Sequence, residues 1–455
     1  MSVVDDQDQQ PSVPEKVEVK HARDTWIGLI RSGGTRMAVL PISAVIGIFN
    51  TRIIIEHYGE ASYAQYGLLV GIGALLPWAD LGISAAIMNV IGGSHDPSRD
   101  SKVHGVLVTC IRILCGSMVT ICAVSVGISV LGLWPTIFGE GLQPGGGAVA
   151  AAVCLALLGI GMPFGIGQRI LAGMGKNHVG LALLGLQAPV TLVTLLILTH
   201  WHVPAGNFVA VIPYGTAVLI ALIATVLGGR MIAPMLGRSV RSAPHVRTER
   251  GGEVFSVAWP MLVQMIALPI AMQTDRIVLS HLSGTTSLAQ YNLASQIYSP
   301  VWAVVSAAGF TLWPVFARER ARGRHASPMS ISLVFGVAAA LVCLGLSLAS
   351  PLLSQVATGG TIHLPVSLLV AYSLFMICQA VKYPLGMYMT DARGLRYQAV
   401  MICLLLPVNL GLSIWLTGLI GPSGPIIGSA VGVLLFQVIA NVVYVRRDRA
   451  KVVGT

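Results

Sequence analysis

The chain of 455 residues is 55% hydrophobic and only 10% charged, with a mean hydropathy of +0.78. Soluble domains carry about 25% charged residues, so a surface this poor in charge must face lipid, which excludes a soluble enzyme and predicts a polytopic α-helical membrane protein. The net charge of +10 does not indicate a nucleic-acid partner, because the cations lie in short segments between apolar runs and no zinc-finger or RNP-type motif is present.

The first 25 residues are polar, contain two prolines and have no apolar core of the kind that signal peptides carry. We expect residues 1–25 to form a disordered cytoplasmic tail. Beyond this tail, apolar runs of about 20 residues, the length that crosses ~30 Å of hydrocarbon, give about twelve candidate spans. These spans lie at 36–56, 63–92, 104–133, 147–172, 178–199, 207–229, 254–281, 288–316, 327–354, 365–391, 397–417 and 425–445.

Lys and Arg are confined to alternate loops. The odd loops contain neither residue; they are 57–61, 135–146, 200–206, 282–288, 355–364 and 418–424. The even loops carry nearly all of them, including Arg99, Lys102, Lys176, Arg230, Arg238, Arg241, Arg318, Arg320, Arg393 and Arg396. Because cytoplasmic loops are enriched in Lys and Arg, this segregation predicts that both termini are cytoplasmic.

The sixth loop is the longest, is rich in Arg and divides the chain near its middle. It is the natural linker between two lobes of six helices each. The expected organisation is a cytoplasmic tail at 1–25, an N-terminal lobe at 26–229, a linker at 230–253, a C-terminal lobe at 254–446 and a cytoplasmic tail at 447–455.

The two halves share an internal repeat. Residues 51–68, TRIIIEHYGEASYAQYGL, match residues 275–293, DRIVLSHLSGTTSLAQYNL, when one extra residue is allowed in the second copy. The match places Arg52 opposite Arg276 and aligns the two Ala-Gln-Tyr triplets. Because an even number of spans separates the copies, the lobes have the same orientation and a pseudo-twofold axis along the membrane normal. Transporters with such repeats bind substrate between the halves.

Four local patterns carry a resemblance to a known family. They are YGEASYAQYGLLVGIGALLPWADLGISAA, the glycine-rich end of the fourth span at 169–176, QTDRIVLSHLSGTTSLAQYNLASQIYSP at 273–300, and Leu312-Trp313-Pro314. Together they make the chain resemble the Wzx-type polysaccharide flippases of the multidrug/oligosaccharidyl-lipid/polysaccharide (MOP) exporter superfamily. The likeness covers almost the whole chain past residue 25.

The resemblance implies an all-α fold of two lobes that alternate access to a central cationic cavity. It implies transport of a polyprenyl-diphosphate-linked oligosaccharide from the inner to the outer leaflet of the bacterial cytoplasmic membrane, for cell-surface polysaccharide biosynthesis. The implied partners are the lipid-linked glycan, membrane lipids, a polysaccharide polymerase and glycosyltransferases.

Ionisable residues inside the membrane indicate where a site lies, because each costs at least ~2.5–3.5 kcal/mol on insertion scales. The cytoplasmic halves of the spans hold Arg36, Asp80, Arg112, Arg169 and Lys382. A diphosphate needs several cations, and Arg donates bidentate hydrogen bonds to phosphate, so we expect the four cations to form a site that opens to the cytoplasm. Arg36 and Arg169 have the alternative of extending to lipid headgroups. Arg112 has the alternative of neutralisation by Asp80.

The outer halves of the spans hold Arg52, Glu56, Asp275 and Arg276. Arg52 and Arg276 occupy equivalent repeat positions, and if both face the axis they form a cation pair that receives the diphosphate near the exit. The alternative for both is extension to the outer lipid headgroups. Arg52 also has the alternative of an ordinary i,i+4 ion pair with Glu56. Asp275 and Arg276 are adjacent and point ~100° apart, so they do not satisfy one another. Asp275, together with Asp80, is the candidate for coupling to H⁺ or Na⁺.

Two other functions remain as alternatives. A MATE-like drug or cation antiporter of the same superfamily needs an acidic cavity, whereas cations outnumber acids here. A glycosyltransferase or ligase acting on polyprenyl lipids needs a large outer loop with catalytic acids, and the longest outer loop, 135–146, holds only Glu140. The sequence contains no Walker A, GxSxG or HExxH motif, so we expect no enzyme activity, no metal site and no cofactor.

Overall fold

The computed structural model describes residues 39, 42–75, 83–94, 96–245, 273–321 and 327–453, and every regular element among them is helical. The N-terminal lobe contains a helix over 42–58, α2 (Glu60–Leu75), α3 (Ile83–Gly93), α4 (Ser101–Val130), α5 (Trp134–Phe138), η2 (Gly139–Gly141), α6 (Gly147–Phe164), α7 (Ile166–Gly173), α8 (Asn177–Gly185), α9 (Gln187–His200), η3 (Gly206–Phe208), α10 (Val211–Met231) and α11 (Met235–Ser242). The C-terminal lobe contains a helix over 273–282, α13 (Gly284–Ala321), α14 (Met329–Thr358), α15 (Val366–Tyr388), α16 (Ala392–Ile420), η4 (Gly421–Ser423), α17 (Gly424–Val433), a π-helical turn η5 (Leu434–Ile439) and α18 (Ala440–Val453). The expected all-α, two-lobe fold is thereby confirmed.

Seven helical segments of the described residues are long and apolar enough to cross a membrane. The last of them, Arg393–Ala450, covers two of the expected spans. Large apolar side chains such as Val130 and Leu348 are 80% and 75% exposed, which in water would be unfavourable over so wide a surface. The chain is therefore a multi-pass membrane protein. The number twelve stays a prediction, because parts of the spans at 36–56, 63–92 and 254–281 lie outside the described residues.

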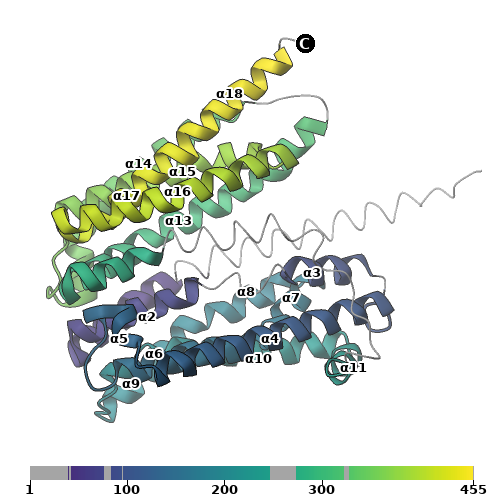
Figure 1. Cartoon of the computed structure of the whole chain (residues 1–455), viewed down its shortest axis with the longest axis horizontal. Helices are drawn as coiled ribbons and strands as arrows, with labels where there is room; N and C mark the ends of the chain where they lie inside the picture. Colours follow the sequence, from purple (N-terminus) through teal and green to yellow (C-terminus); the bar gives the residue numbers. More distant parts are fainter. Residues whose placement is uncertain are drawn as a thin grey trace, which may run out of the picture.

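The two lobes form separate helical bundles that meet at one end and diverge toward the other (Figure 1). They meet where α2 packs against α13, at the end that carries α5, and they diverge toward the end that carries α11 and α18 (Figure 1). A continuous buried core crosses the contact, with Ile54 and Leu68 on one side and Leu279 and Leu288 on the other. The closed end corresponds to the odd loops, which lack Lys and Arg.

Two boundaries differ in detail from the expected domain organisation. The segment expected to be a plain linker, 230–253, begins with the end of α10 and then forms α11, which packs on α4. The last helix, α18, continues to Val453, so it includes Arg446, Arg447 and Arg449, which the sequence pattern assigned to the end of the lobe and the tail. Hydrophobicity alone marks where a span leaves the membrane, and these helices continue beyond that point.

Glycine permits one of the closest helix contacts in the N-terminal lobe. A Cβ atom on Gly167 of α7 would lie 2.2 Å from the backbone nitrogen of Thr225 on α10. Backbone atoms of a packed helix cannot move aside cheaply, so this position requires glycine for steric reasons. By contrast, a Cβ on Gly116 of α4 would meet no atom within 4 Å.

We expect Gly167→Ala to lower the midpoint of thermal unfolding, because overpacking in a well-packed contact costs ~1–3 kcal/mol. Gly116→Ala is the matched control, and it should leave the midpoint unchanged or raise it, since Ala favours a helix over Gly. Thermal unfolding of the detergent-purified protein measures both. Equal midpoints for the two variants would contradict the close α7–α10 contact.

Candidate functional site

A cavity of about 320 Å³ lies between the lobes, just inside their closed end. The helix over 42–58 and α2 line it from the N-terminal lobe, and the helix over 273–282 and α13 line it from the C-terminal lobe. A second cavity of about 180 Å³ reaches into the C-terminal lobe and shares four lining residues with the first, Gln273, Arg276, Ser295 and Ser299. The repeat predicted a site at this junction.

Arg276 is the cation that lines both cavities. Its Nε donates to Asn292 Oδ1 at 3.0 Å, its Nη1 to Gln273 Oε1 at 2.5 Å and its Nη2 to Ser295 Oγ at 3.2 Å. The Tyr291 ring lies 5.6 Å from the guanidinium carbon, a distance at which a cation is attracted to the ring face. These uncharged partners orient the guanidinium without neutralising it.

Ion pairs within the described residues involve other arginines. They join Arg52 to Glu56 and Arg99 to Asp96, and neither includes Arg276. The charge of Arg276 therefore lies in a polar cavity with no carboxylate within 4 Å in the described part of the chain. Such a group favours an anionic ligand, because phosphate oxygens accept charge-assisted hydrogen bonds from a guanidinium.

Asp275 and Arg276 both line the smaller cavity but form no ion pair, and the hydrogen bonds of Asp275 lie within the C-terminal lobe. Asp275 is only 2% exposed and accepts hydrogen bonds from Tyr291 (3.0 Å), Ser429 (3.2 Å) and Ser413 (3.4 Å). Asn409 Oδ1 also lies within hydrogen-bond distance of both serine hydroxyls, 3.1 Å from Ser413 Oγ and 3.2 Å from Ser429 Oγ, and is an alternative acceptor for each. The result is a compact set of oxygen atoms around a buried carboxylate, contributed by the helix over 273–282 and by α13, α16 and α17.

The lobes are joined beside the cavity by polar contacts between α13 and the N-terminal lobe. Asn292 Nδ2 donates to the carbonyl oxygen of Ala64 at 3.3 Å. Thr51 Oγ1 donates to Gln296 Oε1 at 2.7 Å. A Cβ on Gly67 would lie 2.0 Å from Asn292 Nδ2, so the absence of a side chain there makes room for Asn292. Asn292 thus connects Arg276 to the opposite lobe.

Arg52 and Arg276 occupy equivalent positions of the repeat but have different surroundings. Arg52 Nε donates to Glu56 Oε1 at 2.7 Å, and both side chains remain about two-fifths exposed. The ordinary i,i+4 ion pair expected as an alternative for Arg52 is therefore confirmed. Arg52 Nη1 also reaches the carbonyl oxygen of Val356 on α14, at 3.4 Å. Its side chain bridges the lobes, and its charge is already paired.

Lys382 lies inside the C-terminal lobe on α15. Its Nζ donates to Gln437 Oε1 at 2.7 Å and lies 5.4 Å from the Trp302 ring centroid. Gln437 belongs to the π-helical turn η5, a geometry that is frequent at functional sites. Trp302 lines the smaller cavity, so Lys382 lies behind that cavity wall.

The inner cations are not brought together in one site. Arg112 donates to the carbonyl oxygens of Ala243 (2.8 Å) and His245 (3.1 Å), so its charge lies at the C-terminal end of α11. Arg169 folds back over its own helix, where a Cβ on Gly165 would lie 2.4 Å from Nη1. With Lys382 in the other lobe, these are three separate environments. The candidates Arg36 and Asp80 lie outside the described residues.

The sequence pattern did not identify the polar residues around Arg276 and Asp275. Gln273, Asn292, Gln296, Ser413 and Ser429 are uncharged, and short polar residues are common in membrane helices. A usable signal was present in the repeat, where Asn292 follows Ala-Gln-Tyr at the position that Gly67 occupies in the first copy. A polar residue opposite a glycine at the predicted axis indicates a lobe contact.

An apolar groove of about 440 Å³ runs between α13 and α14, next to the polar cavity. Pro300 and Val301 line the groove, and the preceding residue Ser299 lines the cavity. Val304 and Val334, on the two walls, are each more than three-fifths exposed. An amphiphilic ligand would therefore find polar and apolar surfaces on neighbouring faces of one helix.

We expect Gly67→Val to separate the lobes at their closed end, because the new side chain would displace Asn292 from Ala64 and Arg276. Oxidative crosslinking between cysteines introduced as Thr51→Cys and Gln296→Cys measures the separation, and its yield should fall. Adding Asn292→Ala removes the obstructing atoms and should restore the yield, as expected for directly coupled positions. Unchanged crosslinking in the Gly67→Val background would contradict the contact.

Comparison with known proteins gives one family match, over residues 37–320, to the family described as polysaccharide biosynthesis protein. The chain is 23% identical over 291 residues to a putative O-antigen transporter of Salmonella typhi, a match that covers 62% of this chain and 63% of that relative. The chain thus spans less than two thirds of that relative's length.

Two solved structures show a similar fold. One is an inward-facing multidrug resistance MATE family transporter of the MOP superfamily, with a TM-score of 0.64, 17% identity and coverage of 92% of this chain and 99% of that one. The other is the lipid II flippase MurJ in an inward closed conformation, with a TM-score of 0.64, 12% identity and coverage of 90% and 87%. At these identities the likeness establishes the fold alone.

Proposed function

Because the chain belongs to the polysaccharide biosynthesis protein family, we propose that it moves a polyprenyl-diphosphate-linked oligosaccharide from the inner to the outer leaflet of the cytoplasmic membrane. The resemblance to the Wzx-type flippases of the MOP superfamily is confirmed by this match and by the shared fold.

The observation that carries the proposal is the charge of Arg276 in the cavity between the lobes, where no carboxylate of a described residue lies within ion-pair distance. A diphosphate headgroup would accept hydrogen bonds from this guanidinium once the amide oxygen of Asn292 or Gln273 releases it. The apolar groove between α13 and α14 offers a surface for the lipid chain. A cationic drug would meet an unneutralised arginine, so the site favours the flippase over a drug antiporter.

The divergence of the two bundles supports alternating access. Contacts between the lobes gather near the α2–α13 junction, which the loop charges assign to the outer side (Figure 1). In this state the diphosphate would enter from the cytoplasmic side and reach Arg276 at the closed end. Opening to the outside then requires the contacts of Asn292 and Gln296 with the N-terminal lobe to break.

We expect Arg276→Gln to reduce flipping ~10–100-fold, because a hydrogen bond to a charged group contributes about 1.5–3 kcal/mol. Translocation of a fluorescent polyprenyl-diphosphate sugar in proteoliposomes measures this. Arg52→Gln is the matched control, with the same charge removed at the equivalent repeat position, and it should retain most activity because Arg52 is already paired with Glu56. Full activity of the Arg276→Gln variant would overturn the diphosphate model.

We further propose that the oxygen cluster around Asp275 couples transport to an ion. Buried carboxylates in membrane transporters are costly and serve ion pathways, and an all-oxygen environment suits a hard cation such as Na⁺ or a bound proton. Asp275 lies directly beside Arg276 in the chain. Binding or release of an ion at the oxygen cluster can therefore affect the cavity through the helix over 273–282. Asp80, the second coupling candidate, stays a prediction.

Asp275→Asn should abolish the response of transport to imposed gradients while leaving passive equilibration of the probe intact. Uptake by proteoliposomes under an imposed Na⁺ gradient, and separately under an imposed pH gradient, measures the response. Asp96→Asn, an equivalent change in an exposed loop, should respond like the unaltered protein. A preserved gradient response in the Asp275→Asn protein would exclude this residue from coupling.

A further inference from the structure

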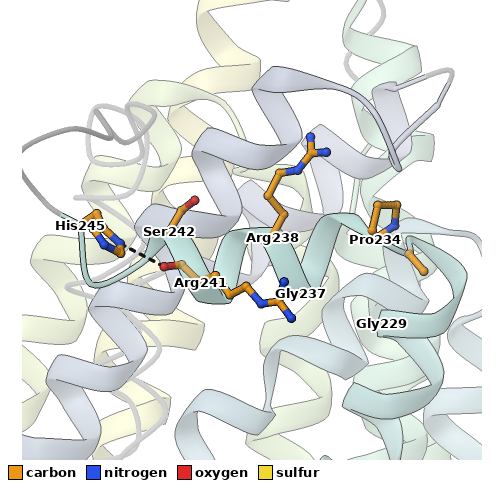
Figure 2. Close-up of a pocket in the computed structure, with 8 residues that line it drawn as sticks. Gly229, Pro234, Gly237, Arg238, Arg241, Ser242 and His245 are labelled. Atoms are coloured by element: carbon orange, nitrogen blue, oxygen red, sulfur yellow. Dashed lines mark hydrogen bonds between the residues drawn. The ribbon is translucent and has the colours of Figure 1, made fainter.

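A separate cavity of about 690 Å³ lies at the corner between α10 and α11, at the end of the N-terminal lobe opposite α5 (Figure 2). Its lining includes Gly229, Pro234, Gly237, Arg238, Arg241 and His245. None of the described residues that line it is acidic. Lys382, Arg276 and Asp275 belong to other cavities or to the C-terminal lobe, so this cavity is independent of the site between the lobes.

The helix that carries these cations is held firmly on α4. Met235 and Ser239 of α11 are buried, and the Ser239 hydroxyl is hydrogen-bonded to His104 Nδ1 at 3.0 Å. Arg112 donates to the carbonyl oxygens of Ala243 and His245 at the other end of the helix. The backbone that positions the cavity's cations is therefore fixed in advance, which lowers the entropy cost of binding a ligand.

The cations themselves remain available. Arg238 and Arg241 are exposed, and neither takes part in an ion pair with another described residue. Figure 2 shows the Arg238 guanidinium extending away from α11 and the Arg241 side chain running along the helix toward Gly237. Two guanidinium groups three residues apart on one helix can both reach an anion bound in the cavity, and planar guanidinium groups match phosphate oxygens in pairs.

An apolar stripe leads to the cavity along α10. Leu219, Leu222 and Val226 are 50%, 41% and 46% exposed, and they are spaced three and four residues apart, so they share one helix face. The same spacing continues to Gly229 near the end of α10, and Gly229 lines the cavity. The stripe is exposed on a helix that is long and apolar enough to cross a membrane, and the cavity lies where the stripe ends.

We propose that this corner binds an anionic phospholipid, with its phosphate between Arg238 and Arg241 and one acyl chain along the Leu219–Leu222–Val226 stripe. The stripe favours a lipid over a free phosphate ion, because a soluble anion gains nothing from it. Arginines that only set the orientation of a loop relative to the membrane need no cavity beside them. The cavity therefore supports a binding role for Arg238 and Arg241.

Native mass spectrometry of the detergent-purified full chain, titrated with phosphatidylglycerol or phosphatidylcholine, tests the proposal. Phosphatidylglycerol should be retained and phosphatidylcholine should not. Each arginine removed should weaken retention about five-fold, so Arg238→Gln/Arg241→Gln should lose most of the bound lipid. The matched control is Arg393→Gln/Arg396→Gln, an exposed pair with the same spacing in the other lobe, and it should retain the lipid as the unaltered protein does.

A third variant separates a cavity site from diffuse surface charge. A Cβ on Gly237 meets no atom within 4 Å, so Gly237→Leu fills the cavity without straining α11 or changing its charge. It should reduce phosphatidylglycerol retention, whereas excess inorganic phosphate at constant ionic strength should leave retention by the unaltered protein unchanged. Equal losses in both arginine pairs, full retention by Gly237→Leu, or displacement by inorganic phosphate would each overturn the proposal.

Discussion

The contact between Asn292 and the backbone at Gly67 holds the two lobes together at their closed end. One amide side chain accepts a hydrogen bond from Arg276, donates one to Ala64 and occupies the space that a side chain at Gly67 would fill. The lobes can approach this closely only because one partner has no Cβ. The size of the cavity, the orientation of its arginine and the divergence of the bundles at the other end all depend on this approach.

Cations that look alike in the sequence have different roles once their neighbours are known. Arg52 is neutralised by Glu56, Arg112 satisfies carbonyl oxygens at a helix end, and Arg276 is oriented by uncharged groups. A guanidinium with a carboxylate or helix-end partner is a structural element, because its charge is already compensated. A guanidinium held by amides and hydroxyls keeps its positive electrostatic potential. That potential, rather than the depth of the residue in the membrane, identifies the candidate site.

The sequence predicted the coarse architecture well because hydrophobicity, loop charge and an internal repeat each act over whole spans. These features predicted the all-α fold and the two lobes, and they named Arg276 and Asp275 as candidate residues. They could not predict that Arg112 would reach α11, because that contact joins residues more than a hundred positions apart across a loop expected to be irregular. Nor could they predict the serine and asparagine oxygens around Asp275, since small polar residues leave no distinctive periodicity.

The Asn292–Gly67 contact also bears on how such a molecule could arise from a duplicated half. Positions 67 and 292 are equivalent in the repeat, so in a symmetric pair of identical half-length chains both would carry the same residue. Two asparagines at this separation would collide, and two glycines would leave a void without hydrogen bonds. A side chain in one copy and a matching space in the other exist only when the copies differ in sequence, so this closed interface requires two non-identical halves.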